Sequence, residues 1–111
     1  MAEQLGDLTR THTCGALRAE DVGADAVLLG WVHRVRDLGG LLFVDIRDRG
    51  GITQIVFDKD DEPLMARAKR LRSEFVIGAV GRARRRSPDT INPKLPTGEV
   101  EVVARRLARL T

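Results

Sequence analysis

Apolar and polar side chains alternate most regularly in residues 41–47. One face of this segment, if extended, is apolar and carries Leu42, Val44 and Ile46. The opposite face carries Phe43, Asp45 and Arg47. Because successive side chains of a β-strand point to opposite sides, this period of two predicts a strand with its first face in a core.

Four other segments also show strand character and are bounded by turn residues. The glycine pairs Gly39-Gly40 and Gly50-Gly51 permit the positive φ that tight hairpins require, and they separate three consecutive apolar runs. The period of two returns later, at 75–86 and again at 99–110. The chain therefore predicts strands at 25–37, 41–47, 52–57, 75–86 and 99–110.

A different spacing separates the third and fourth of these strands. Leu64, Ala68 and Leu71 recur at helical intervals. Asp60 or Asp61 can cap the helix. Pro63 suits its first turn, and three cations follow late, where they favour the helix dipole: Lys69, Arg70 and Arg72. The pattern predicts a helix of about three turns.

This order of elements predicts an all-β fold with one helix, a five-stranded OB-fold Greek-key barrel whose helix lies between strands 3 and 4. A small SH3-like barrel is the main alternative, but it does not ordinarily carry a helix at that point. Residues 1–10 are polar and unpatterned and predict a flexible N-terminal arm, which leaves 11–111 as the barrel domain. Residues 13–24 predict a turn or one helical turn, and 87–98 a loop with three prolines.

Composition is compatible with one globular domain that binds nucleic acid. The chain has 111 residues, with 42% hydrophobic and 32% charged side chains. The net charge is only +3, although arginine raises the pI to about 9.7. The single cysteine, Cys14, excludes an internal disulfide. Without a membrane-length apolar run or a secretory signal, we expect a cytoplasmic protein that does not enter membranes.

The outer face of the predicted barrel offers groups suited to unpaired nucleotides. If the second strand turns Val44 inward, Phe43 projects outward, where its ring can stack on a base. Arg34, Arg36 and Gln54 are placed beside it by the expected pairing, and they can grip phosphates or read base edges. Each residue also has a simpler interpretation, because single exposed aromatics and solvated ion pairs with Asp37 or Asp45 are common.

The densest basic cluster lies at the end of the fourth strand and consists of Arg82, Arg84, Arg85 and Arg86. These residues lead into the proline-rich loop, which could close over bound RNA, although a charged edge that prevents aggregation explains Arg82 and Arg85 equally well. A carboxylate on a basic RNA-binding face lowers affinity unless it accepts a hydrogen bond from a base. Glu101, if it lies there, is therefore expected to select a base.

The sequence predicts no catalytic or metal site. It contains no serine–histidine–aspartate spacing, no phosphate-binding loop of the Gly-x-x-x-x-Gly-Lys type and no cluster of histidine or cysteine ligands. His12 and His33 are isolated, so surface or structural roles are expected for both.

Several motifs resemble the N-terminal anticodon-binding domain of bacterial aspartyl-tRNA synthetases, which are class IIb aminoacyl-tRNA synthetases. The matching segments are Gly-Trp-Val-His-Arg-Val-Arg-Asp-Leu-Gly-Gly at 30–40, Leu-Phe-Val-Asp-Ile-Arg-Asp-Arg at 42–49, Gly-Ile-Thr-Gln-Ile-Val-Phe at 51–57, Arg-Ser-Glu-Phe-Val at 72–76 and Thr-Gly-Glu-Val-Glu-Val at 97–102. The resemblance covers about residues 11–110. It implies an OB fold that splays out the anticodon of Asp-tRNA.

The resemblance also implies roles for individual residues. Phe43 matches an aromatic that stacks on an anticodon base, Gln54 a reader of base edges, and Glu101 the carboxylate that helps choose the first anticodon base. Arg36 matches an arginine that touches the anticodon loop. Further RNA contacts match Arg86, Thr90 and Asn92. With the residues placed from the strand pattern, the expected RNA-binding set is Arg34, Arg36, Phe43, Gln54, Arg84, Arg86, Thr90, Asn92 and Glu101.

Departures from the resembled family limit what the chain is expected to do. Val35 stands where the family often has arginine, and Leu38 favours the members that accept only Asp-tRNA. The class II catalytic domain, which uses ATP and Mg and forms the homodimer, is not contained in this sequence. We therefore expect recognition of the GUC anticodon by tRNA binding, with no catalysis and no cofactor for this chain alone. A general single-strand binder and an engineered barrel without retained binding remain alternatives.

Overall fold

The computed structural model describes residues 9–110, and within them five strands form a closed barrel. The strands are β1 (Asp25–Leu38), β2 (Leu41–Asp48), β3 (Gly51–Asp58), β4 (Val76–Arg85) and β5 (Val100–Arg109). The helices in this part of the chain are α1 (Glu62–Ala68) and the short 3-10 helices η1 (Ala19–Asp21) and η2 (Pro88–Thr90). All five predicted strands are confirmed, and the single helical turn expected within 13–24 is η1.

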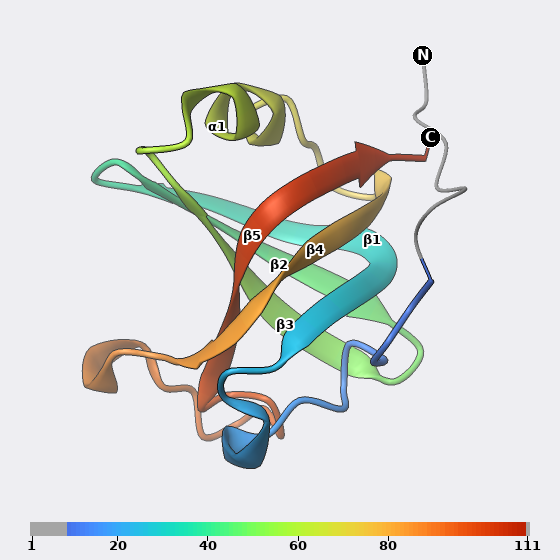
Figure 1. Ribbon diagram of the computed structural model, residues 1–111, viewed down its shortest axis with the longest axis vertical. Coiled ribbons are helices and arrows are strands. Elements are labelled where there is room, and N and C mark those ends of the chain that lie inside the picture. The colour runs from blue at the N-terminus through green and yellow to red at the C-terminus, as the bar shows by residue number, and fades with distance from the viewer. Residues whose placement is uncertain (1–8, 111) are drawn as a thin grey trace.

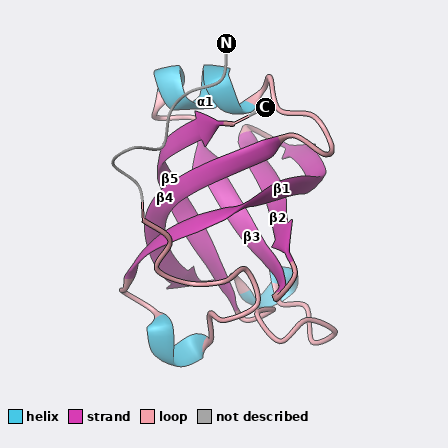
Figure 2. Cartoon of the chain, turned by 90° about the vertical axis from the view of Figure 1, so that its right-hand side faces the viewer, coloured by secondary structure: helices cyan, strands magenta, loops and turns pink. Residues whose placement is uncertain are grey.

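The strands follow the order β1-β2-β3-β5-β4, and β4 pairs with β1 to close the barrel (Figure 1). β3 and β5 are parallel, whereas the other neighbours are antiparallel. Helix α1 lies across one end of the barrel, as Figure 2 shows from the side. This is the arrangement predicted for an OB fold, with the helix between the third and fourth strands.

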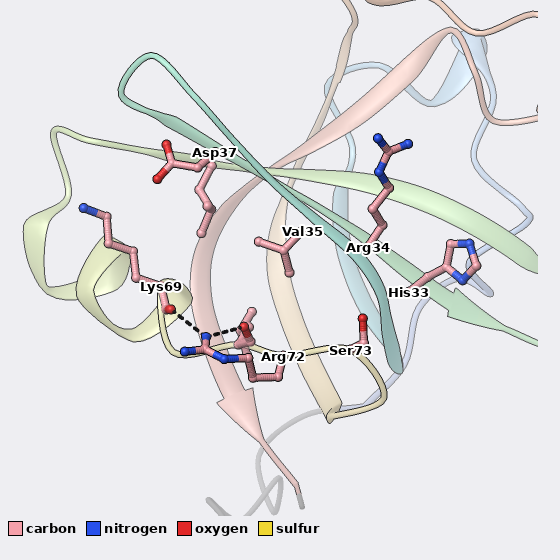
Figure 3. Close-up of a pocket in the computed structure, with 9 residues that line it drawn as sticks. His33, Arg34, Val35, Asp37, Lys69, Arg72 and Ser73 are labelled. Carbon is pink, nitrogen blue, oxygen red and sulfur yellow. Dashed lines mark hydrogen bonds between the residues drawn. The ribbon is translucent and has the colours of Figure 1, made fainter.

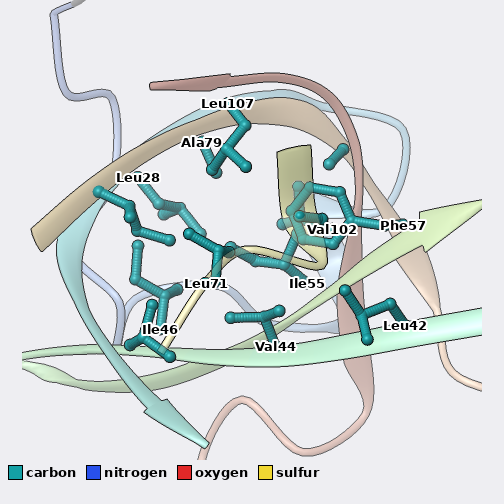
Figure 4. Packing of buried hydrophobic residues seen from close by; sticks show 14 of the residues in the cluster. Leu28, Leu42, Val44, Ile46, Ile55, Phe57, Leu71, Ala79, Val102 and Leu107 are labelled. Carbon is teal, nitrogen blue, oxygen red and sulfur yellow. The ribbon is translucent and has the colours of Figure 1, made fainter. Parts of the chain in front are cut away.

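The predicted inward face of β2 does line the core. Leu42 is paired with Phe57, Val44 with Ile55 and Ile46 with Thr53 on β3, and all of these residues are buried. Side chains from the other strands complete the cluster, among them Leu28, Ala79, Val102 and Leu107 (Figure 4). Removing this apolar surface from water is the main force that closes the barrel.

The third strand is buried on both faces, which its alternating pattern did not predict. Ile55 and Phe57 point into the barrel, yet Gln54 and Val56 on the outer face are also only 1% exposed. A buried amide must keep its hydrogen bonds, because losing them costs about 1–3 kcal/mol. The outer face of β3 is therefore a packed surface that holds a polar side chain in a defined position.

Helix α1 begins as predicted but is shorter than predicted. The Asp61 side chain accepts a hydrogen bond from the Leu64 amide (3.2 Å), with Pro63 in the first turn. The helix ends at Ala68 after seven residues, about two turns rather than three. Leu71 is still buried, although it lies beyond the helix. The helical spacing of apolar residues extends past the end of the helix, because the segment that contains Leu71 packs on the same core.

The segment before β1 is attached to the barrel from Thr11 onward, where the Thr11 amide donates to Val27 O (3.1 Å). Asp48, the last residue of β2, accepts hydrogen bonds from the backbone amides of Cys14 (2.8 Å) and Gly50 (2.7 Å). Gly15 is required there, because a β-carbon would overlap the carbonyl of Gly50. The predicted arm, residues 1–10, falls largely outside the described residues.

Burial and hydrogen bonding act oppositely on the pKa of Asp48. Burial alone would raise it, but the bonds from the amides of Cys14, Gly50 and Gly51 favour the charged carboxylate and lower the pKa overall. Burial also raises the pKa of the Cys14 thiol. Cys14 is therefore a protonated, structural side chain at neutral pH.

Candidate nucleic-acid interface

Strand pairing places two rows of side chains across the outer face of the barrel. Residues paired between neighbouring strands point to the same side of a sheet. The polar row, in the order β1, β2, β3, β5, β4, consists of Arg34, Asp45, Gln54, Glu101 and Arg84. The apolar row beside it consists of Arg36, Phe43, Val56, Val103 and Arg82. Arginines therefore flank both rows.

A chain of hydrogen bonds connects the two rows and crosses four strand boundaries, from β1 to β4. Arg36 Nη2 donates to Gln54 Oε1 (2.6 Å), and Gln54 Nε2 donates to Glu101 Oε1 (2.9 Å). Arg84 Nε donates to Glu101 Oε2 (2.6 Å). A cation at the carbonyl end of the amide and an anion at its NH2 end fix the orientation of Gln54.

Glu101 is a buried carboxylate at the centre of this surface. The residue is 4% exposed, and each of its oxygens accepts one of the bonds described above. Burial of an ionised carboxylate is costly unless it is paired and hydrogen-bonded, and both conditions are met here. Strand register places Glu101 on the outer face, which the sequence had left open, and its position is fixed before any ligand binds.

Phe43 lies on the predicted outer face, but its ring is covered. The residue is 9% exposed, because the guanidinium carbon of Arg36, its partner across β1 and β2, lies over the ring at 5.4 Å from the centroid. The same guanidinium approaches Asp45 at 3.7 Å. The freely projecting ring expected from the alternation is thus corrected to a ring in contact with a cation.

Arg36 is held between Phe43, Asp45 and Gln54 but is not fully satisfied. Its Nε is buried and has no hydrogen-bond partner among residues 9–110. An unpaired buried donor of a charged group costs free energy that a new partner could recover. Arg36 is therefore suited to exchange its internal contacts for contacts with a ligand.

Arg34 differs from Arg36 in being exposed on the rim of the surface. The β1–β2 register shifts between Val32 and Arg34, which brings Arg34 opposite Asp45. Beside it, a hollow of about 460 Å³ lies between β1 and the 69–73 segment. Figure 3 shows the Arg34 guanidinium pointing away from Arg72, which itself donates to the carbonyls of Lys69 (3.2 Å) and Leu71 (3.0 Å). Arg34 is nevertheless one of the residues that line this hollow.

Arg86 follows β4 and is turned inward, unlike Arg84. It is 5% exposed, and it donates through Nε to Val100 O (2.9 Å) and through Nη1 to Thr90 O (3.0 Å). Burial lowers the pKa of the guanidinium, while Asp45 and Glu101 favour its charge. Arg86 thus anchors the 87–98 loop in the described structure, and its role in contacting RNA stays a prediction.

The loop that carries Thr90 and Asn92 is attached at several points. Thr90 hydrogen-bonds the Ser87 hydroxyl (3.1 Å), and the Asn92 side chain accepts from the Lys94 amide (3.0 Å). The Thr97 hydroxyl donates to Ile52 O on β3. The loop expected to close over RNA is therefore fastened to the barrel, and its RNA contacts also stay predictions.

The structure adds to the surface four residues that were not in the expected RNA-binding set: Asp45, Val56, Arg82 and Val103. Their membership follows from strand register, and a hydrophobic pattern within one strand does not reveal register between strands. Within residues 9–110, no group of three or more metal-ligating side chains is present. None of the helices in this range is long and apolar enough to cross a membrane.

Comparison with known proteins agrees with the fold. The family model for OB-fold nucleic acid binding domains that carries the label tRNA anti-codon matches residues 26–110. The aspartate–tRNA(Asp/Asn) ligase of Desulfosudis oleivorans is 52% identical over 99% of the chain. The chain spans about a fifth (19%) of the length of that relative.

Solved structures show the same barrel. Asparaginyl-tRNA synthetase from Pyrococcus horikoshii, complexed with asparaginyl-adenylate, aligns with a TM-score of 0.73 and 27% identity, over 90% of this chain and 22% of that one. An OBody bound to hen egg-white lysozyme aligns with a TM-score of 0.82, over 94% of this chain and 95% of that one. Its 21% identity shows the fold alone.

Proposed function

The chain belongs to the family of OB-fold nucleic acid binding domains, and from this we propose that it recognises the anticodon of Asp-tRNA as one domain of an aspartate–tRNA ligase. The relatives that match along almost the whole chain carry the name aspartate–tRNA(Asp/Asn) ligase. In such an enzyme, residues outside this chain would bind ATP and Mg and form the dimer contacts. The enzyme would be located in the cytoplasm. The chain itself supplies recognition.

The observation that carries the proposal is the fixed hydrogen-bond chain Arg36–Gln54–Glu101–Arg84. Base edges are distinguished by donors and acceptors in defined positions. Gln54 offers both kinds of group and Glu101 offers acceptors only, so a guanine edge, with its imino and amino donors, suits Glu101. A general single-strand binder needs stacking and cations but not a buried, oriented amide beside a buried carboxylate.

Phe43 and Arg36 explain how a base could enter. A base that stacks on Phe43 takes the place of the guanidinium now lying over the ring. Stacking on an aromatic contributes about 1–3 kcal/mol per base. The displaced Arg36 carries an unpartnered Nε and gains a phosphate or a base oxygen as its new acceptor.

A titration with RNA hairpins tests the proposal. The probes are a stem-loop with GUC in its loop, the same stem with the three bases changed, and a DNA copy, all at one salt concentration because phosphate contacts are salt-dependent. We expect the GUC hairpin to bind at least about tenfold more tightly, the effect of one good base contact. Equal affinity for all three probes would instead identify a general single-strand binder.

A GUU hairpin, the anticodon of Asn-tRNA, separates the two kinds of ligase. Leu38 led us to expect the type restricted to Asp-tRNA, whereas the relatives' names include both tRNAs. Similar affinity for GUC and GUU would support the wider specificity for this domain.

A further inference from the structure

A second basic surface lies on β4 and β5, next to the polar row. A hollow of about 320 Å³ is lined by Arg82, Arg84, Val103 and Arg105. Arg82 and Val103 are paired across the two strands and close the apolar row. Three guanidinium groups thus surround an apolar floor at the edge of the candidate interface.

Carboxylates pair with these arginines but leave N–H donors available for a ligand. Asp25 Oδ1 lies 2.7 Å from Arg105 Nη2 and 3.7 Å from Arg82 Nε. All three side chains are more than half exposed, so these pairs contribute little stability and exchange readily. Each guanidinium has five N–H donors, and one carboxylate cannot satisfy two such groups. Arg84 donates to Glu101 through its Nε.

The hollow continues the line of base-reading groups. Gln54 is on β3, Glu101 on the neighbouring β5 and Arg84 on β4, one strand further. Neighbouring strands are about 4.8 Å apart, so the hollow begins within one strand spacing of Glu101. A nucleic acid that crosses the strands along the polar row meets Gln54, then Glu101, and then the three arginines.

We propose that Arg82 and Arg105, with Arg84 at the margin, bind the backbone phosphate of the nucleotide adjoining the recognised triplet. This rests on the proposed function, because the triplet must first occupy the polar row. OB folds bind about 4–16 nucleotides, more than a triplet alone requires. The planar fork of arginine fits phosphate oxygens, and Val103 offers the adjoining nucleotide an apolar contact.

Single phosphates neutralised in the RNA test the site. The GUC stem-loop is prepared as a series in which one loop phosphate at a time is replaced by a neutral methylphosphonate. Each RNA is titrated against the unchanged chain, Arg82→Gln, Arg105→Gln and the control Arg70→Gln, which removes an exposed charge beyond α1. Thermal unfolding checks that every variant is folded.

We expect one methylphosphonate, next to the triplet, to weaken binding to the unchanged chain by about threefold to tenfold. The same replacement should have a smaller effect on Arg105→Gln and on Arg82→Gln, since each variant lacks one of the two cations proposed to bind that phosphate. Each of these variants should also reduce the slope of log K against log salt by about 0.7, the value for one phosphate of a single strand. Arg70→Gln should retain the full methylphosphonate effect.

Two results would overturn the site. One is a methylphosphonate profile that is identical for Arg105→Gln, Arg82→Gln and the unchanged chain. The other is a loss of affinity in Arg70→Gln equal to that in Arg82→Gln and Arg105→Gln, which would show that only the net charge of the chain matters. Neither result touches the proposed function if the GUC hairpin is still preferred. Loss of that preference in the unchanged chain would overturn the proposed function and, with it, the inferred site.

Discussion

The centre and the rim of the outer face hold similar charged groups in different physical states. At the centre, Gln54 and Glu101 are almost completely buried and hydrogen-bonded to each other. At the rim, Asp25, Arg82 and Arg105 are exposed and share weaker, competing contacts. Buried polar groups are expensive to misplace and therefore stay fixed, whereas exposed charges act over longer distances and tolerate substitution. Under the proposed function, we expect specificity to come from the centre and electrostatic affinity from the rim.

The largest expected effect is at Phe43, whose substitution tests whether its ring belongs to the buried centre. Phe43→Ala should lower the free energy of unfolding by about 3 kcal/mol, since the ring is covered and its loss leaves a cavity. A stability loss below about 1 kcal/mol in urea denaturation would show that the ring is effectively at the rim.

Phe43→Leu serves as the matched variant, because it keeps most of the apolar volume and removes the aromatic face. It should cost about 1 kcal/mol of stability. Binding of the GUC hairpin should fall by about tenfold, the lower part of the range for one stacked base. Unchanged binding in Phe43→Leu would exclude stacking on this ring.

Glu101 and Glu99 allow a direct comparison of centre and rim within three residues of sequence. Glu101→Ala should destabilise the fold by about 2 kcal/mol, because it leaves the Gln54 amide buried without its acceptor. Glu99 is exposed and lies 3.6 Å from Arg85, so Glu99→Ala should change stability by less than about 0.5 kcal/mol. Urea denaturation of both variants measures the difference, and equal values would remove the distinction between centre and rim.

Asp48 should give the smallest effect, a contribution to stability that is present at neutral pH and lost in acid. Its folded pKa is lowered, so its stabilisation is complete above the unfolded value and is lost as pH falls through the folded value. Between about pH 5 and pH 2, the chain should therefore lose more stability than Asp48→Asn does. The exposed loop residue Asp89 provides the control, and Asp89→Asn should follow the unchanged chain. Parallel acid profiles for Asp48→Asn and the unchanged chain would contradict the role of its backbone hydrogen bonds.

Local patterns were reliable where one physical cause dominated. The alternation of Leu42, Val44 and Ile46 located β2 and its inward face, since one side of that strand must be buried. The helix start was also predictable, because Asp61 and Pro63 act within a single turn. The helix end was misjudged, since Leu71 packs on the core without being helical.

The sequence predicted which residues make up the candidate interface, but not their burial or their contacts. Phe43, Gln54 and Glu101 were expected on one surface, and register places all three on the outer face. That Arg36 covers the ring depends on the pairing of β1 with β2. The position of Gln54 depends on its hydrogen bonds to Arg36 and Glu101, which are 18 and 47 residues away in sequence. Neither spacing nor residue type contains this information.

The sequence by itself determined the strands, their inward faces, the position of the helix and the set of RNA-suited side chains, because period and capping act over a few residues. Tertiary contacts settle which of those side chains are buried and hydrogen-bonded and which are exposed. Barrel closure brings β5 beside β3 and β4 beside β1, and this non-local pairing joins Arg36, Gln54, Glu101 and Arg84 into one chain of hydrogen bonds with a buried centre. The same closure gathers Arg82 and Arg105 around Val103 at its edge.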